Sequence, residues 1–251
     1  MEQTFMKEKK ILPLVLSMSL PMMLSMLVNS LYNIVDSYFV AQISEQAMTA
    51  LSLVYPLQLL ETAIAVGFGI GMNAAAAYYL GAKEQQRADD IVTSGLILSL
   101  LHGVILMAAA LLFAPVFVSL FTENEKILAD GVKYSNLVFV FAVPNVIAIT
   151  FEKIFQAEGR MKVSMFSMLC GCVANIILDP LLIFGIGIFP KMGIEGAAIA
   201  TGIGQVIPLI VYLFIFIKHP VALHFHWHKK AFQKRLVGQM YGVCLLYTSP
   251  S

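Results

Sequence analysis

The stretch CVANIILDPLLIF, residues 172–184, places two polar side chains, Asn175 and Asp179, inside an otherwise apolar run. The run extends on both sides and covers residues 163–186. About 20 mostly apolar residues are enough to cross a bilayer as a helix. The stretch therefore predicts a membrane-spanning helix that carries a carboxylate, and the rest of the chain has to explain why that carboxylate is there.

The composition of the whole chain agrees with a membrane protein. Of its 251 residues, 59% are hydrophobic and 12% are charged, whereas soluble domains are nearer half apolar and a quarter charged. The net charge of +1 gives no basic surface for nucleic acid, so we exclude nucleic acid as a partner. We predict an integral membrane protein whose surroundings are the lipid bilayer.

Six apolar runs are long enough to span a membrane. This predicts an all-α fold, a bundle of six transmembrane helices. The runs cover residues 13–40, 48–80, 91–118, 132–156, 163–186 and 194–217.

Basic residues predict how the bundle is oriented. If the N-terminus is cytoplasmic, 13 of the 16 Lys and Arg residues fall on the inner side, and only Lys126, Lys133 and Lys191 fall outside. Cytoplasmic loops of membrane proteins carry the excess of Lys and Arg. We therefore expect both ends of the chain to be cytoplasmic.

Prolines interrupt most of the predicted spans. Each removes an N–H group and tends to kink its helix, which suits a protein that bends or rocks. They are Pro21, Pro56, Pro144, Pro180 and Pro208.

Two carboxylates lie within the spans, and each has amide neighbours on its helix face. Asn33 lies three residues before Asp36 in the first span, on the same helix face, and Asn175 lies one turn before Asp179. A charged Asp at the centre of a span costs about 2.5–3.5 kcal/mol on insertion scales. We identify no Lys or Arg at similar depth, so the carboxylates can be neutralised by a proton or by Na⁺. Thr201, midway along the sixth span, can add a hydroxyl oxygen.

Each polar residue also has a simpler explanation. Asp179 and Pro180 together can be the start of a helix, with Asp as the N-cap and Pro in the first turn. Asp36 can be an interfacial residue that water reaches. Gln58 and Glu61, one turn apart in the second span, can face a water-filled cleft.

Catalytic motifs do not stand out from the sequence. We find no HExxH, no Ser with His, and no Asp-rich magnesium motif within one span. An intramembrane enzyme is therefore the less favoured alternative, and we expect no cofactor and no metal other than a coupling ion.

Five stretches together resemble the multidrug and toxic compound extrusion (MATE) family, in particular its bacterial DinF/MepA-like branch. They are LPLVLSMSLPMMLSMLVNSLYNIVDSYFVAQIS, YYLGAKEQQRADDI, FQAEGRMKVSM, NIILDPLLIFG and MGIEGAAIATGIGQ. Each motif alone is weak, but all five occur in order between about residues 11 and 217.

The resemblance implies a fold and an activity. It implies one six-helix lobe of a twelve-helix transporter in the bacterial cytoplasmic membrane. Such proteins export cationic and amphipathic compounds in exchange for H⁺ or Na⁺ by alternating access. A flippase for lipid-linked oligosaccharides, from the same superfamily, is the alternative. It would need cationic residues in its cavity for a pyrophosphate group, and we expect none here.

The resemblance also implies roles for individual residues. It assigns the coupling ion to Asp36, Asn175, Asp179 and Thr201. Pro21 is the expected bend of the first span. Asn33, Gln58 and Glu61 are further candidate cavity residues.

The resemblance covers only an N-terminal lobe. We divide the chain into the lobe at 1–217, a cytoplasmic linker at 218–243, and a tail at 244–251 that resembles sequence read-through rather than native protein. The missing C-terminal lobe is the expected partner, and the fragment alone is expected not to transport. The alternative is a six-helix protein that dimerises.

Overall fold

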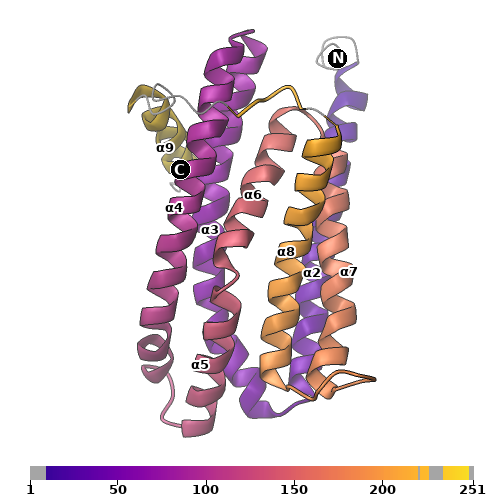
Figure 1. Cartoon of the computed structure of the whole chain (residues 1–251), viewed down its shortest axis with the longest axis vertical. Coiled ribbons are helices and arrows are strands. Elements are labelled where there is room, and N and C mark those ends of the chain that lie inside the picture. The colour runs from indigo at the N-terminus through magenta and orange to yellow at the C-terminus, as the bar shows by residue number, and fades with distance from the viewer. Residues whose placement is uncertain (1–9, 220, 226–233, 249–251) are drawn as a thin grey trace.

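The computed structural model describes residues 10–219, 221–225 and 234–248, and their regular structure is a bundle of long helices joined by short turns (Figure 1). Successive spans are antiparallel, as short connections require, and α5 continues into α6 within a single span. The helices are α2 (Ile11–Ala41), α3 (Glu45–Gly81), α4 (Gln85–Ser119), α5 (Glu125–Phe139), α6 (Ala142–Ala157), α7 (Met161–Phe184), α8 (Ile194–Lys218) and α9 (Lys234–Thr248).

The six predicted spans are confirmed, with ends that agree within three residues except that α4 and α5 begin six and seven residues earlier than predicted. Among the described residues, α2, α3, α4, α7 and α8 are long and apolar enough to cross a membrane, and α5 with α6 makes a sixth span. The fold is therefore an all-α bundle of six membrane-spanning segments.

The fourth span differs from its prediction, because it is two helices that meet at an angle of 48° rather than one. The break falls at Val140 and Phe141, four and three residues before Pro144. Pro144 has no N–H to bond the carbonyl of Val140, and the break places it in the first turn of α6, where no such bond is needed.

Other prolines lie inside continuous helices. Pro180 is inside α7, which runs on to Phe184, so the alternative of a helix that starts at Asp179 is wrong. Pro21, Pro56 and Pro208 lie inside α2, α3 and α8 as predicted. Pro115, which the prediction left out, lies inside α4.

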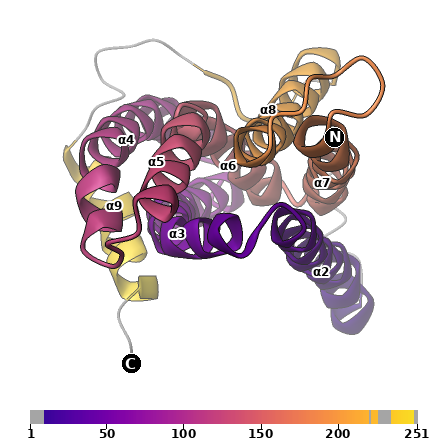
Figure 2. The ribbon, with the colours of Figure 1, turned by 90° about the horizontal axis from the view of Figure 1, so that it is seen from below.

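Seen along the bundle, α2, α7 and α8 form one group beside the group of α3, α4, α5 and α6 (Figure 2). Glycines bring α7 and α8 very close. A Cβ atom on Gly171 would overlap the carbonyl oxygen of Gly204, and a Cβ on Gly204 would lie 3.0 Å from Cβ of Asn175. This contact sets the spacing of the two helices that carry three of the four predicted ion ligands.

The two ends of the bundle differ in charge. The end near the N-terminus also holds the α3–α4 and α6–α7 turns, with Lys83, Arg87, Arg160 and Lys162 (Figure 1). The opposite end holds the α2–α3, α4–α5 and α7–α8 turns, and the basic residues described near it are Lys126, Lys133 and Lys191 (Figure 1).

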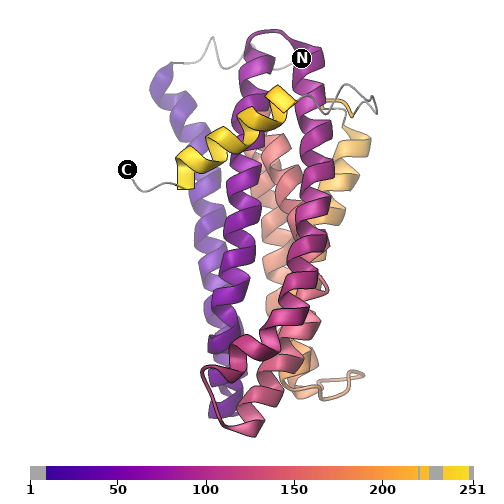
Figure 3. The same ribbon diagram turned by 90° about the vertical axis from the view of Figure 1, so that its left-hand side faces the viewer.

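Helix α9 lies across α3 and α4 near the N-terminal end (Figure 3). Met240 is fully buried there, and the Tyr79 hydroxyl donates to Gln239 Oε1 at 2.9 Å. The helix continues through the predicted boundary at residue 243. The division into linker and tail, with the read-through origin of the tail, stays a prediction.

Candidate functional site

Three helices bring the four predicted ion ligands together in the half of the bundle away from the N-terminus. Asp36 comes from the last turns of α2, Asn175 and Asp179 from α7, and Thr201 from α8. All four side chains are buried, with exposed fractions of 7%, 1%, 0% and 4% in that order. We call these four residues the cation site.

Within the cation site, Asn175 contacts Asp179 on its own helix, α7, and Thr201 on α8. When its amide is oriented so that both polar atoms have partners, the nitrogen donates to Asp179 Oδ2 at 3.2 Å. The amide oxygen then accepts from the backbone N–H of Thr201 at 3.3 Å. Asp36 approaches from α2, close enough for its charge to interact with that of Asp179.

A cavity of about 440 Å³ opens beside the cation site, and Asp36 and Thr201 lie on its wall. Asp36 Oδ1 and Thr201 Oγ1 are buried and have no hydrogen-bond partner among the described residues. Gln58 and Tyr134 line the same cavity and add further oxygens. An unpartnered buried carboxylate oxygen is costly, so this arrangement favours a proton or a hard cation that the oxygens can bind.

The remaining predicted residues lie in three different settings. Pro21 is buried in α2, and its carbonyl accepts from Ser25 Oγ at 2.9 Å. Asn33 and Gln58 line both the cavity beside the cation site and a second cavity, described below. Glu61 is buried outside both linings, where its carboxylate accepts from Asn145 Nδ2 at 3.1 Å and ties α3 to α6.

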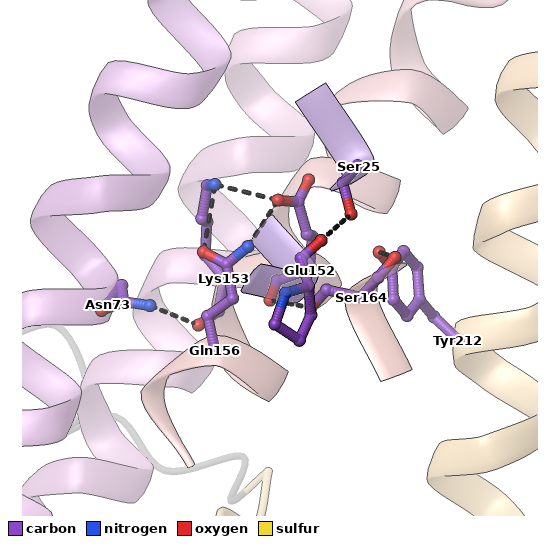
Figure 4. A network of polar contacts seen from close by, with 8 residues as sticks. Ser25, Asn73, Glu152, Lys153, Gln156, Ser164 and Tyr212 are labelled. Carbon is purple, nitrogen blue, oxygen red and sulfur yellow. Dashed lines mark hydrogen bonds and ion pairs between the residues drawn. The ribbon is translucent and has the colours of Figure 1, made fainter. Parts of the chain in front are cut away.

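The second cavity, of about 370 Å³, lies between α2, α3, α6, α7 and α8 and contains a polar cluster that the sequence analysis missed. Lys153 Nζ donates to Glu152 Oε1 at 3.0 Å and to Gln156 Oε1 at 3.2 Å, and Gln156 Nε2 donates to Glu152 Oε1 at 2.6 Å (Figure 4). We call these three residues the α6 triad.

The α6 triad corrects the expectation that the cavity contains no basic residue. Lys153 was grouped with the inner loop, but it lies inside α6 with only 7% of its side chain exposed. Its charge is matched by Glu152, so the cavity gains no excess of positive charge for a pyrophosphate group. The spacing of Glu152 and Gln156, one turn apart, was the sequence signal that could have revealed the cluster.

The MatE family profile matches residues 21–181. The chain belongs to the MATE family. The FAD transporter of Shewanella oneidensis strain MR-1 is 31% identical over 206 residues, which cover 81% of this chain and 45% of that protein.

Two further comparisons agree. The multidrug export protein MepA of Staphylococcus aureus strain MRSA252 is 28% identical over 220 residues, covering 87% of this chain and 48% of MepA. A crystal structure of a MATE protein in the bent conformation superposes with a TM-score of 0.84 at 27% identity, over 92% of this chain and 51% of that one. The chain thus spans about half the length of the relatives it matches, as an N-terminal lobe does.

Membership of a transporter family also decides between classes of protein. The relatives are named as transporters or export proteins, which confirms the expectation that the chain is not an enzyme. The MATE lobe described here is therefore a multi-pass membrane protein whose family acts on small molecules.

Proposed function

We propose that this chain is the N-terminal lobe of a secondary active transporter that exports cationic or amphipathic small molecules in exchange for H⁺ or Na⁺. The C-terminal half that the relatives have would supply the second lobe, and the two would rock around a central site. The names of the relatives support transport of drug-like or cofactor-like compounds.

The observation that carries the proposal is the unpartnered, buried Oδ1 of Asp36 on the wall of a cavity. In the proposed cycle Asp36 and Asp179 take up the ion, Asn175 holds Asp179 whichever form it is in, and Thr201 adds a hydroxyl oxygen. Binding a proton removes a charge, and binding Na⁺ balances one, so either ion changes the balance of forces between α2 and α7.

The two cavities share part of their walls, which gives a physical basis for coupling. The shared side chains are Tyr32, Asn33, Tyr55, Gln58 and Thr201. A ligand in the second cavity, of about 370 Å³, therefore touches residues that also border the ion. Occupancy of one site would alter the shape of the other, as exchange of two ligands requires.

The test is export by the complete two-lobe transporter in vesicles, with a pH gradient and a Na⁺ gradient imposed separately. Asp36→Asn and Asp179→Asn should each reduce gradient-driven export of a fluorescent organic cation to background, and Asn175→Ala should reduce it less. Glu61→Gln is the control, because Glu61 lies outside both cavities. Export at wild-type rates by both Asp variants under both gradients would refute the proposal.

We further propose that the N-terminal end of the bundle faces the cytoplasm of a bacterial cell, because that end carries most of the basic residues. Single cysteines introduced at Glu45, Glu123 and Lys191 in a cysteine-free background should react with an impermeant maleimide in intact cells. Cysteines at Lys83 and Arg160 should react only after permeabilisation, and the reverse pattern would invert the orientation.

A further inference from the structure

The second cavity, which contains the α6 triad, presents a pair of opposite charges rather than a net charge. Among its described lining residues, only Glu152 and Lys153 carry formal charges, and both belong to the α6 triad. Much of the remaining wall is apolar, with Met22, Met26 and Val66 among its residues. A ligand in this cavity would therefore meet one adjacent acid–base pair, and otherwise only apolar side chains and uncharged amides and hydroxyls.

The α6 triad is closed upon itself. Lys153 Nζ reaches two acceptors, and Glu152 Oε1 accepts from two donors. A ligand with a single positive charge that took the place of Lys153 on Glu152 Oε1 would leave the Lys153 ammonium group without its ion-pair partner. A ligand with a single negative charge that drew Lys153 away would leave the Glu152 carboxylate without its partner in the same way. Removing one member of a buried pair is strongly unfavourable.

A ligand that carries both charges avoids this cost. Its acidic group can accept from Lys153 while its basic group donates to Glu152, so that every charge keeps a partner. We propose that the α6 triad is a binding subsite for zwitterionic substrates, those with an acidic and a basic group a few bonds apart. The proposal rests on the proposed function only in that the cavity is taken to admit substrates.

The surroundings hold the triad in place before any ligand arrives. Asn73 Nδ2 on α3 donates to the backbone carbonyl of Lys153 at 2.9 Å, and Ser164 Oγ on α7 donates to that of Glu152 at 3.4 Å (Figure 4). Gly69 leaves room for the Lys153 side chain, because a Cβ there would lie 2.9 Å from Lys153 Cγ. A site fixed in advance loses less entropy when it binds its ligand.

Three small probes with one indole ring separate the possibilities. They are L-tryptophan (zwitterion), tryptamine (cation) and indole-3-propionate (anion). Their dissociation constants would be measured by saturation-transfer NMR with the 251-residue chain in lipid nanodiscs, after subtracting the signal from empty nanodiscs. We expect the wild type to bind L-tryptophan at least about tenfold more tightly than either of the other probes.

Single-charge variants should redirect the preference. In Lys153→Gln the remaining carboxylate should make tryptamine the tightest of the three probes, and in Glu152→Gln the remaining ammonium should favour indole-3-propionate. Lys162→Gln and Glu123→Gln make the same chemical changes at exposed positions and should keep the wild-type order.

The double variant Glu152→Gln, Lys153→Gln covers the case in which a single variant fails to fold, since it leaves no charge unpaired. It should bind the three probes with similar affinity. A wild type that binds none of the probes, or shows no preference for L-tryptophan, would overturn the proposal. So would a preference for L-tryptophan that survives in Lys153→Gln or in the double variant. Binding is measured without transport, so failure of the ion-coupled export leaves this result standing, and the reverse also holds.

Discussion

The cation site and the α6 triad are built from the same pair of residue types and differ in one neighbour. Each has a carboxylate and an amide one helical turn apart: Asn175 with Asp179 on α7, and Glu152 with Gln156 on α6. In the triad, Lys153 supplies the positive charge. In the cation site the described residues supply none, and an oxygen of Asp36 is left unpartnered. A carboxylate and an amide one helical turn apart can thus form either of two kinds of site. The site is closed where a lysine of the chain pairs with the carboxylate, and open where no such cation is present.

Removing that internal cation is expected to have the largest effect on stability. Lys153→Met leaves the Glu152 charge without its ion-pair partner inside the lobe, which should lower the free energy of unfolding by about 3 kcal/mol. The measurement is unfolding by SDS in mixed micelles. The double variant Glu152→Gln, Lys153→Met should recover most of the loss.

An exposed lysine provides the control for this experiment. Lys162→Met should change the free energy of unfolding by less than about 0.5 kcal/mol. If Lys153→Met has an equally small effect, the triad is not a stabilising ion pair and the contrast between the two sites fails.

A change in the α7–α8 contact should come next in size. The methyl group of Gly171→Ala would overlap the Gly204 carbonyl and lie 2.6 Å from Pro208 Cγ. Overpacking of this kind costs about 2 kcal/mol. It should also separate Asn175 from Thr201, while the α6 triad keeps its order of probe affinities.

Gly81→Ala is the matched control, because nothing lies within 4 Å of its added methyl group. SDS unfolding of both variants checks the prediction. Equal stabilities for Gly171→Ala and Gly81→Ala would show that α7 and α8 can move apart without cost.

A much smaller effect on stability is expected at the open site. Asp36→Asn keeps the size of the side chain and removes a carboxylate whose Oδ1 lacks a partner. We expect the free energy of unfolding to fall by no more than about 1 kcal/mol or to rise. SDS unfolding in the absence of Na⁺ measures this, and a loss as large as that of Lys153→Met would erase the distinction between open and closed sites.

The smallest expected effect concerns Glu158, in the turn after α6. Burial raises the pKa of Glu158 above its ordinary value of 4.5, although the N–H of Leu223 donates to its carboxylate at 2.9 Å. A raised pKa in the folded state means that the stabilising contribution is present below the ordinary pKa and is lost as the pH rises through the raised value. Glu158→Gln should therefore make stability less dependent on pH from about 4.5 upward. Unfolding measured at several pH values tests this, and an unchanged pH profile would contradict it.

Much of the fold could be predicted from the sequence, because long apolar runs have few ways to satisfy their backbone groups in a bilayer. The break between α5 and α6 was harder. Pro144 indicated a disturbance, but a proline can either kink a helix or begin one, and packing decides between the two. The course of α9 over α3 depends on contacts between distant residues and left no local signal.

The cation site could be predicted from the sequence, and the α6 triad could not. Asp36 and Asp179 were found because an acidic residue in an apolar run is conspicuous. Glu152, Lys153 and Gln156 lie near the end of a span, and charged residues at such a position usually belong to the adjoining loop. Only the depth of α6 within the bundle shows that Lys153 turns toward a cavity.

The hydrogen bonds of α6 have a mechanical consequence. Asn145, in the first turn of α6, donates to Glu61 on α3, and Asn73 on α3 donates to the carbonyl of Lys153 in a later turn of α6. Two hydrogen bonds, widely spaced along the helices, therefore join α3 to α6. The side-chain hydrogen bonds described for α2 all end on its own backbone. If a force acts on this lobe, α3 and α6 should therefore keep their relative position, and α2 should be the helix that moves.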